Sequence, residues 1–106
     1  MYRQGDVLVV PIDAAELPQN LVAAPRDHRN RMVLARGEAT GHAHVVTGER
    51  VSMLCPADEP GRFYLLIEGY GRLGHEEHGP IALSPGAYRV LHQREYVPGA
   101  VRPVAD

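Results

Sequence analysis

The sequence predicts an all-β fold, a small barrel or sandwich of about seven short strands. Short runs of apolar and β-branched residues repeat with a period of two, which is typical of strands. The 11 glycines and 9 prolines among 106 residues separate these runs into many short elements. No stretch shows the apolar period of a long amphipathic helix. A chain of this length is expected to form a single domain, residues 1–106, with residues 97–106 as an extended tail.

The strands can be placed in order along the chain. They are expected at residues 7–12, 31–36, 37–47, 51–55, 62–68, 81–83 and 87–96. Residues 13–30 are polar, contain Pro18 and Pro25, and are expected to form a loop with at most one helical turn. The tetrapeptide Thr47-Gly48-Glu49-Arg50 predicts a tight turn, which would join the strands on either side of it into a hairpin.

Composition excludes several classes of protein. A net charge of −2 argues against a general nucleic-acid binder, whose affinity comes from a basic excess. The single cysteine, Cys55, cannot form an intrachain disulfide and is expected in the core. No segment approaches the roughly 20 apolar residues of a membrane span, and the first residues lack an apolar signal region. A cytoplasmic protein without a membrane partner is expected, and a protein partner or a homo-oligomer stays open.

The first candidate site is the motif GHAH. Residues two apart in a strand point to the same face, so His42 and His44 should project side by side, with Glu38 and Thr40 in the same row. Two imidazoles at this spacing can bind one divalent transition metal ion, with a carboxylate or water completing the coordination. A lone pair of this kind is also found among solvated or hydrogen-bonded histidines.

A second motif, His75-Glu76-Glu77-His78, strengthens the metal hypothesis. Neighbouring glycines and Pro80 predict a turn, in which both rings can point the same way. We therefore expect His42, His44, His75 and His78 to be ligands of a Zn, Fe or Mn ion. Two alternatives stay open: a structural network of hydrogen-bonded His and Glu side chains, or no common site.

The remaining polar candidates have smaller roles. His92 either joins the site or is a half-buried residue with its own hydrogen-bond partner, and His28 is expected to be exposed in the polar loop. Ser52 and Ser84 have no base beside them, so a hydroxyl nucleophile is not expected. If the protein is an enzyme, Glu38, Glu76 or Glu77 next to a metal-activated water is the simplest general base.

The motifs GEATGHAH (residues 37–44) and HEEHGPI (residues 75–81), the stretch that follows up to residue 96 and the opening YRQGDVLVVP resemble a family of small uncharacterised bacterial and phage-borne proteins. An arginine-only set of basic residues, typical of a GC-rich bacterial genome, agrees with such a source. The resemblance spans nearly the whole chain and implies kinship without an activity.

A weaker resemblance is to the cupins, whose first motif has H-x-H followed by Glu, here His42, His44 and Glu49. Their second motif has P-x-G before a histidine, whereas Pro85 and Gly86 are adjacent here. The resemblance implies metal chemistry by analogy alone.

Two functions follow from these observations. The first is a small metal-binding protein with either a hydrolytic or a regulatory role. The alternative is a binding or accessory module, phage-related in the sense of the family above, in which the same residues form a structural network of His and Glu side chains. In that case the exposed arginine-rich loop and the tyrosine-bearing face would carry the function. The sequence leaves open whether the protein is an enzyme.

Overall fold

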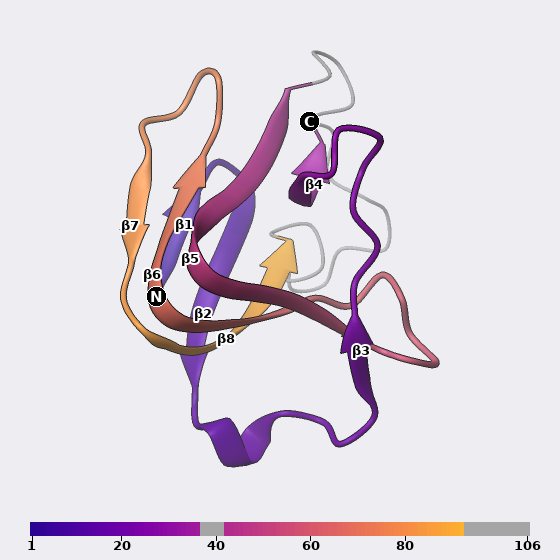
Figure 1. Cartoon of the computed structure of the whole chain (residues 1–106). Helices are drawn as coiled ribbons and strands as arrows, with labels where there is room; N and C mark the ends of the chain where they lie inside the picture. The colour runs from indigo at the N-terminus through magenta and orange to yellow at the C-terminus, as the bar shows by residue number, and fades with distance from the viewer. Residues whose placement is uncertain (37–41, 93–106) are drawn as a thin grey trace, which may run out of the picture.

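The computed structural model describes residues 1–36 and 42–92 (Figure 1). It confirms the all-β prediction: the described strands form one antiparallel sheet, and the only helical element among them is a short 3-10 turn. The elements are β1 (Tyr2–Gln4), β2 (Val7–Ile12), η1 (Ala14–Glu16), β3 (Leu21–Ala23), β4 (Met32–Arg36), β5 (Ala43–Pro56), β6 (Tyr64–Gly74), β7 (Ile81–Leu83) and β8 (Gly86–His92).

The sheet is organised around its two longest strands, β5 and β6. Its main path runs β1-β2-β8-β6-β5-β3, while β4 pairs with β5 and β7 pairs with β6. One half of β5 therefore has β4 beside it and the other half has β3, and β6 is shared in the same way between β7 and β8. The bend of these two strands gives an open, sandwich-like sheet, and the ladders of the described residues do not close it into a barrel (Figure 1).

The predicted hairpin at residues 47–50 is wrong. β5 passes through this segment as one strand, and its ladder with β6 shifts register between Glu49 and Val51. Arg50 has φ 54° and Gly48 has φ 147°, so the irregular backbone is absorbed in a bulge and the chain does not reverse. A Cβ atom at Gly48 would overlap the carbonyl oxygen of Tyr70 on β6, and glycine therefore permits the close approach of the two strands.

The other strand predictions have mixed outcomes. β2 and β7 have the expected bounds, whereas β6 continues to Gly74 through a glycine-rich segment expected to be irregular. The short strands β1 and β3 were not expected. Residues 37–41, including Glu38 and Thr40, and the expected tail at residues 97–106 lie outside the described residues.

Apolar side chains from both bent halves of the sheet form a common core. Val7 and Val9 of β2 and Leu65 and Leu73 of β6 have no exposed surface. Cys55 is buried among them, as expected for a small apolar residue. Within the described ranges, no helix is long and apolar enough to cross a membrane.

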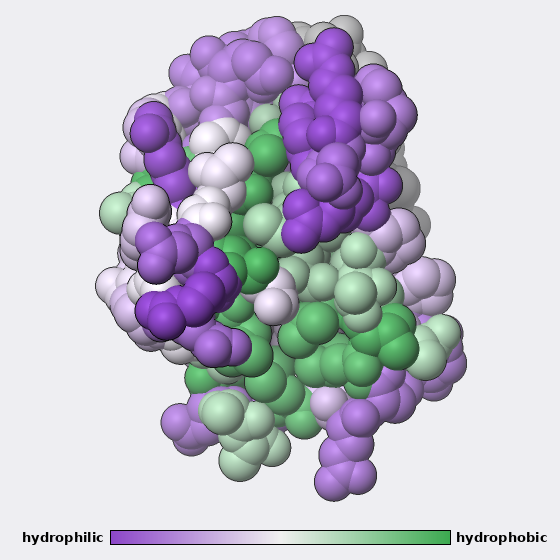
Figure 2. All heavy atoms as spheres, viewed as in Figure 1, coloured by the Kyte–Doolittle hydropathy of each residue, from purple (hydrophilic) through white to green (hydrophobic). Residues whose placement is uncertain are grey.

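At one end of the sheet, the Gln4 side chain links β1 to β6 and to the β6–β7 connection. Gln4, at the end of β1, is 2% exposed. Its amide nitrogen donates to the carbonyl oxygens of Leu73, on β6, and of Gly79, in the β6–β7 connection, both at 3.0 Å. The β1–β2 turn, the start of β5 and the β6–β7 connection thus lie at the same end, the upper one in Figure 1. Figure 2 shows mainly hydrophilic residues over this end and hydrophobic residues in the middle and lower part of the view.

Candidate metal centre

The structure brings the two histidine motifs together at this end of the sheet. We call His42, His44, His75 and His78 the histidine cluster. The ring of His75 is central: its centroid lies 4.3 Å from that of His44, 4.7 Å from that of His78 and 5.8 Å from that of His42. The rings of His44 and His78 stack with their centroids 6.2 Å apart. Antiparallel pairing causes this convergence, because Val45 at the start of β5 lies opposite Gly74 at the end of β6.

Three donors within the region are closer to one another than the rest. One ligand atom each from His42, His75 and Glu76 lies within 4.8 Å of the other two. This group contains two of the four predicted ligands, His42 and His75, together with the Glu76 carboxylate. His44 and His78 are not members of it but contact the ring of His75. Glu76 is one of the predicted general-base candidates, and its position also makes it a candidate ligand.

The Glu76 carboxylate is held over the start of β5. Its Oε2 accepts the backbone N–H of Ala43 at 3.2 Å. The pKa of Glu76 is lowered, first by a hydrogen bond from its own backbone N–H. Desolvation of the carboxylate opposes this shift, while the Ala43 N–H and the charges of the His42 and His75 rings add to it. An ionised carboxylate is the form that binds a cation.

Glu77, the other glutamate of the motif, lies against His42. Its Oε1 is 2.6 Å from Nδ1 of His42, and both side chains are partly exposed. The contact is an ion pair by distance and lacks the angle of a hydrogen bond. The charge of the carboxylate still favours a proton on Nδ1, which would leave the lone pair on Nε2. Glu77 is thus the motif glutamate that lies against an imidazole of the histidine cluster, while Glu38 lies outside the described residues.

His44 is the buried member of the histidine cluster, with 4% of its surface exposed. Its Nδ1 lies 2.9 Å from Oε1 of Gln4, and its Nε2 lies 3.8 Å from Oδ1 of Asp6. Burial first, and then repulsion from His75, lower the pKa of His44 to about 4 against the attraction of Asp6. The ring is therefore neutral at pH 7, as a metal ligand must be.

His75 is arranged differently. Its Nδ1 accepts the backbone N–H groups of Glu77 at 3.0 Å and His78 at 3.3 Å, and these bonds shape the turn. The proton of the neutral ring then sits on Nε2. Binding of an ion through either nitrogen of His75 requires these two hydrogen bonds to break or the tautomer to change.

Sequence reasoning missed the β1–β2 turn, which supplies Gln4, Gly5 and Asp6 to this region. A Cβ atom at Gly5 would lie 3.0 Å from Nε2 of His78 and 3.3 Å from Cε1 of His44, so the turn packs directly against both rings. Gln4, Gly5 and Asp6 directly precede the first predicted strand, residues 7–12. Their side chains carry no metal motif by themselves, so the sequence held no local signal for them.

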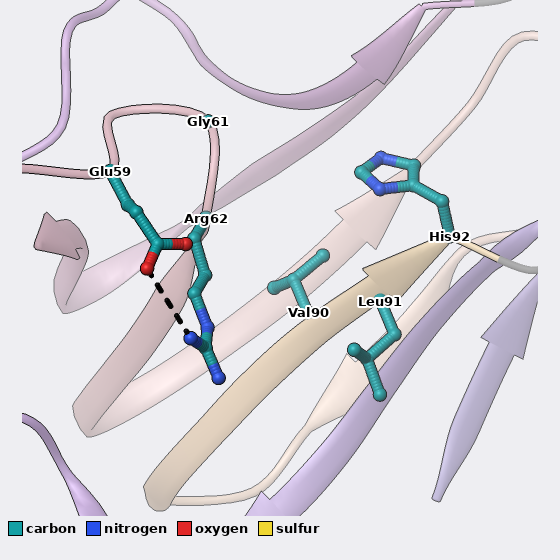
Figure 3. Close-up of a pocket in the computed structure, with 6 residues that line it drawn as sticks. All are labelled: Glu59, Gly61, Arg62, Val90, Leu91 and His92. Carbon is teal, nitrogen blue, oxygen red and sulfur yellow. Dashed lines mark ion pairs between the residues drawn. The ribbon is translucent and has the colours of Figure 1, made fainter. Parts of the chain in front are cut away.

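The other histidines lie apart from the tight group. Nε2 of His92 is 3.3 Å from the carbonyl oxygen of Leu34 on β4, which agrees with a half-buried residue that has its own partner. His28 is exposed, as expected. His92 lines a separate cavity of about 330 Å³, and Figure 3 shows its ring across this cavity from the ion pair of Glu59 and Arg62.

The position of Glu49, the third residue of the cupin-like motif, does not support the cupin resemblance. Glu49 is exposed and lies opposite Tyr70 at the bulge, four ladder positions from the pair formed by Val45 and Gly74.

Comparison with known proteins identifies a family to which the chain is similar. No curated protein and no solved structure matches the sequence. Residues 3–93 match a domain of unknown function, DUF8820, and this range holds the whole histidine cluster together with Gln4 and Asp6. Because the match covers most of the chain, the protein belongs to the DUF8820 family.

Proposed function

We propose that the protein binds a divalent transition metal ion, Zn, Fe or Mn, at the histidine cluster. One observation carries the proposal: two motifs more than thirty positions apart in the sequence place four imidazoles and a carboxylate at one end of the sheet. Imidazole and carboxylate ligands together suit these ions. A chance grouping of solvated histidines would not require the buried and oriented ring of His44.

The ligands of the proposed site form two groups. His42, His75 and Glu76 are the innermost donors, and their separations of up to 4.8 Å need to contract by roughly 1 Å to surround an ion about 2 Å from each. His44 and His78 are the other two proposed ligands, because their rings contact the ring of His75 and so lie beside the ion. Glu77 acts on the site through His42, by holding the proton on Nδ1.

A hydrolytic or a regulatory role is compatible with this site. A divalent ion polarises a bound carbonyl and lowers the pKa of water. A shallow hollow of about 250 Å³, lined by Ala43, Val45, Gly74, His75 and Glu76, would admit a small substrate group beside the donors. Glu77, which follows Glu76 on the same turn and is more than half exposed, stays a candidate general base beside this hollow's lining residues. In a regulatory role, the ion would instead hold the start of β5 and the β6–β7 connection together.

The experiment that tests metal binding uses protein purified without an affinity tag. We expect close to one equivalent of a transition metal per chain by elemental analysis, or stabilisation by added Zn²⁺, Fe²⁺ or Mn²⁺. Replacing His42 and His44 together by Ala should abolish both the metal content and the stabilisation. The matched control is His28→Ala, because His28 is exposed in the loop before β4 and is not a member of the histidine cluster. A wild-type protein that neither carries a metal nor is stabilised by one contradicts the proposal.

The hydrogen bonds that Nδ1 of His75 accepts favour a second candidate function, an accessory module in which the histidines form a structural polar network. Both hydrogen bonds to Nδ1 of His75 already satisfy that atom without an ion. The arginine-rich loop offers less than its composition suggests, because Arg26 donates to the carbonyl oxygen of Asn30 and the Asp27 carboxylate pairs with Arg31 and Arg36 after the loop. A metal-free protein whose stability falls when His75 is replaced would favour this candidate.

A further inference from the structure

The orientation of the Gln4 amide decides which nitrogen of His44 carries a proton. The amide nitrogen of Gln4 donates to the carbonyl oxygens of Leu73 and Gly79, both at 3.0 Å. The opposite orientation would place the amide oxygen against two carbonyl oxygens, which is repulsive. Oε1 must therefore face His44, and since Oε1 only accepts, Nδ1 of His44 is the donor across 2.9 Å.

This fixed tautomer leaves a lone pair on Nε2 of His44. The atom facing it is Oδ1 of Asp6, at 3.8 Å. A carboxylate oxygen and an imidazole nitrogen that carries a lone pair are both acceptors, so neither donates to the other. The separation is also too long for a hydrogen bond. Two acceptors that face each other at this distance match two ligands of one cation, which lie roughly 3 to 4 Å apart when each is about 2 Å from the ion.

The β1–β2 turn holds Asp6 in this position. Gly5 has φ 60°, the left-handed conformation that glycine adopts at little cost. Because a Cβ atom there would lie within 3.3 Å of both His44 and His78, the backbone of the turn is as close to the rings as packing allows. The Asp6 carboxylate, which is 40% exposed, is thereby directed at His44 from the solvent side.

On the basis of the proposed metal site, we propose that Asp6 is a carboxylate ligand of the ion, paired with Nε2 of His44. Gln4 is a positioning residue that keeps the lone pair of His44 on Nε2. The β1–β2 turn is then a third segment of the metal centre, beside the two histidine motifs.

Asp6→Asn tests the ligand, because it keeps the shape of the side chain and removes its charge. The probe is Zn²⁺, with the dissociation constant measured by competition against a chromophoric chelator. Loss of outer-sphere partners weakens metal binding about 10 to 100-fold, so loss of a direct ligand should weaken it about 100-fold or more. The matched control is Asp58→Asn, because Asp58 is exposed and pairs with Asn20 away from the site. Its dissociation constant should equal that of the wild type.

Nuclear magnetic resonance of the ring nitrogens tests the geometry in the wild-type protein. We expect Nδ1 of His44 to carry the proton without metal, and the Nε2 resonance to move when Zn²⁺ is added. Gln4→Met, which keeps the volume but removes the amide, should mix the two tautomers, an effect that a purely structural role of Gln4 would not produce.

The outcomes separate the two proposals. Wild-type protein that binds no Zn²⁺ overturns the metal site and this inference together. Tight wild-type binding with the same dissociation constant in Asp6→Asn overturns only the role of Asp6, as does a proton found on Nε2 of metal-free His44.

Discussion

Nδ1 of His42 lies 2.6 Å from Oε1 of Glu77, so a carboxylate from the turn after β6 meets a ring at the entry to β5. The two residues stand thirty-five positions apart in the sequence and come together only because β5 and β6 are paired. A carboxylate that accepts the N–H of a histidine ligand orients the ring and makes it a better electron donor. This contact links the acidic residues of one motif to the imidazoles of the other.

Glu77→Gln should weaken Zn²⁺ binding by about 10 to 100-fold, because an amide holds the proton of His42 less strongly than a carboxylate does. Isothermal titration with Zn²⁺ measures the change. Glu68→Gln is the matched control, since Glu68 is exposed on β6 and contacts none of the donors described above. Equal affinities for Glu77→Gln and the wild type would remove Glu77 from the site.

Removing the metal should lower the melting temperature. An ion present at a hundred times its dissociation constant stabilises the folded state by about 2.7 kcal/mol. For a domain of this size the melting temperature then falls by roughly 10 to 20 °C when a chelator is added. Thermal denaturation followed by circular dichroism, with and without chelator, provides the measurement. The variant with both His42 and His44 replaced by Ala should melt at the same temperature in both conditions.

Gly5→Ala should destabilise the protein by about 1 to 2 kcal/mol, because alanine is strained at positive φ. The added methyl group would also press on the rings of His44 and His78, so Zn²⁺ binding should weaken in parallel. Urea denaturation and zinc titration measure the two effects. Gly61→Ala is the matched control, because no atom lies within 4 Å of the Cβ position at Gly61. A neutral Gly5→Ala would mean that the turn does not press on the rings.

The loop before β4 depends on Asp27, whose side chain is 7% exposed. Its carboxylate accepts backbone N–H groups of Arg29 and Arg31 and pairs with the guanidinium groups of Arg31 and Arg36. Burial alone would raise the pKa of Asp27, but the hydrogen bonds from Arg31 and Arg29 outweigh burial and hold the pKa well below its usual range.

Asp27→Asn should therefore be less stable than the wild type at pH 7. A carboxyl group with a depressed pKa in the folded state contributes stability above its unfolded pKa, near 3.9, and loses that contribution as the pH falls further. The difference between the two proteins should shrink below about pH 4. Urea denaturation at pH 7 and at pH 3 measures it. A difference that is independent of pH would contradict the role of the ionised carboxylate.

Local pattern was sufficient for some elements and insufficient for others. Residues 7–12 and 81–83 alternate clearly between turn residues, and β2 and β7 have these bounds. The pattern at residues 47–50 is the same for a turn and for a bulge, because both need residues that tolerate positive φ. Only the pairing of β5 with β6 decides between them, and pairing is a property of the whole sheet. The short strands β1 and β3 likewise depend on partners far away in the sequence.

The residues of the site likewise divide into those that local sequence pattern predicts and those that depend on distant contacts. Histidine spacing indicated that His42 and His44 share a region with His75 and His78, and their rings do lie together, while the binding of a metal stays a prediction. Gln4 and Asp6 could not be predicted, because a single amide or carboxylate near the start of a chain has no spacing that points to a metal. Their role depends on the hydrogen bonds from Gln4 to β6 and to the β6–β7 connection.

The wide separation of the site's segments also has a kinetic consequence. Residue 4 contacts residues 44, 73 and 79, so the contacts of Gln4 with this region need both the β5–β6 ladder and β1 in place. Contacts between such distant positions form late, because the loops between them must close first. An ion bound there would join a nearly complete fold and would slow unfolding much more than it speeds folding. The bound ion would therefore stabilise the folded domain mainly by slowing its unfolding. Folding itself would not require the ion.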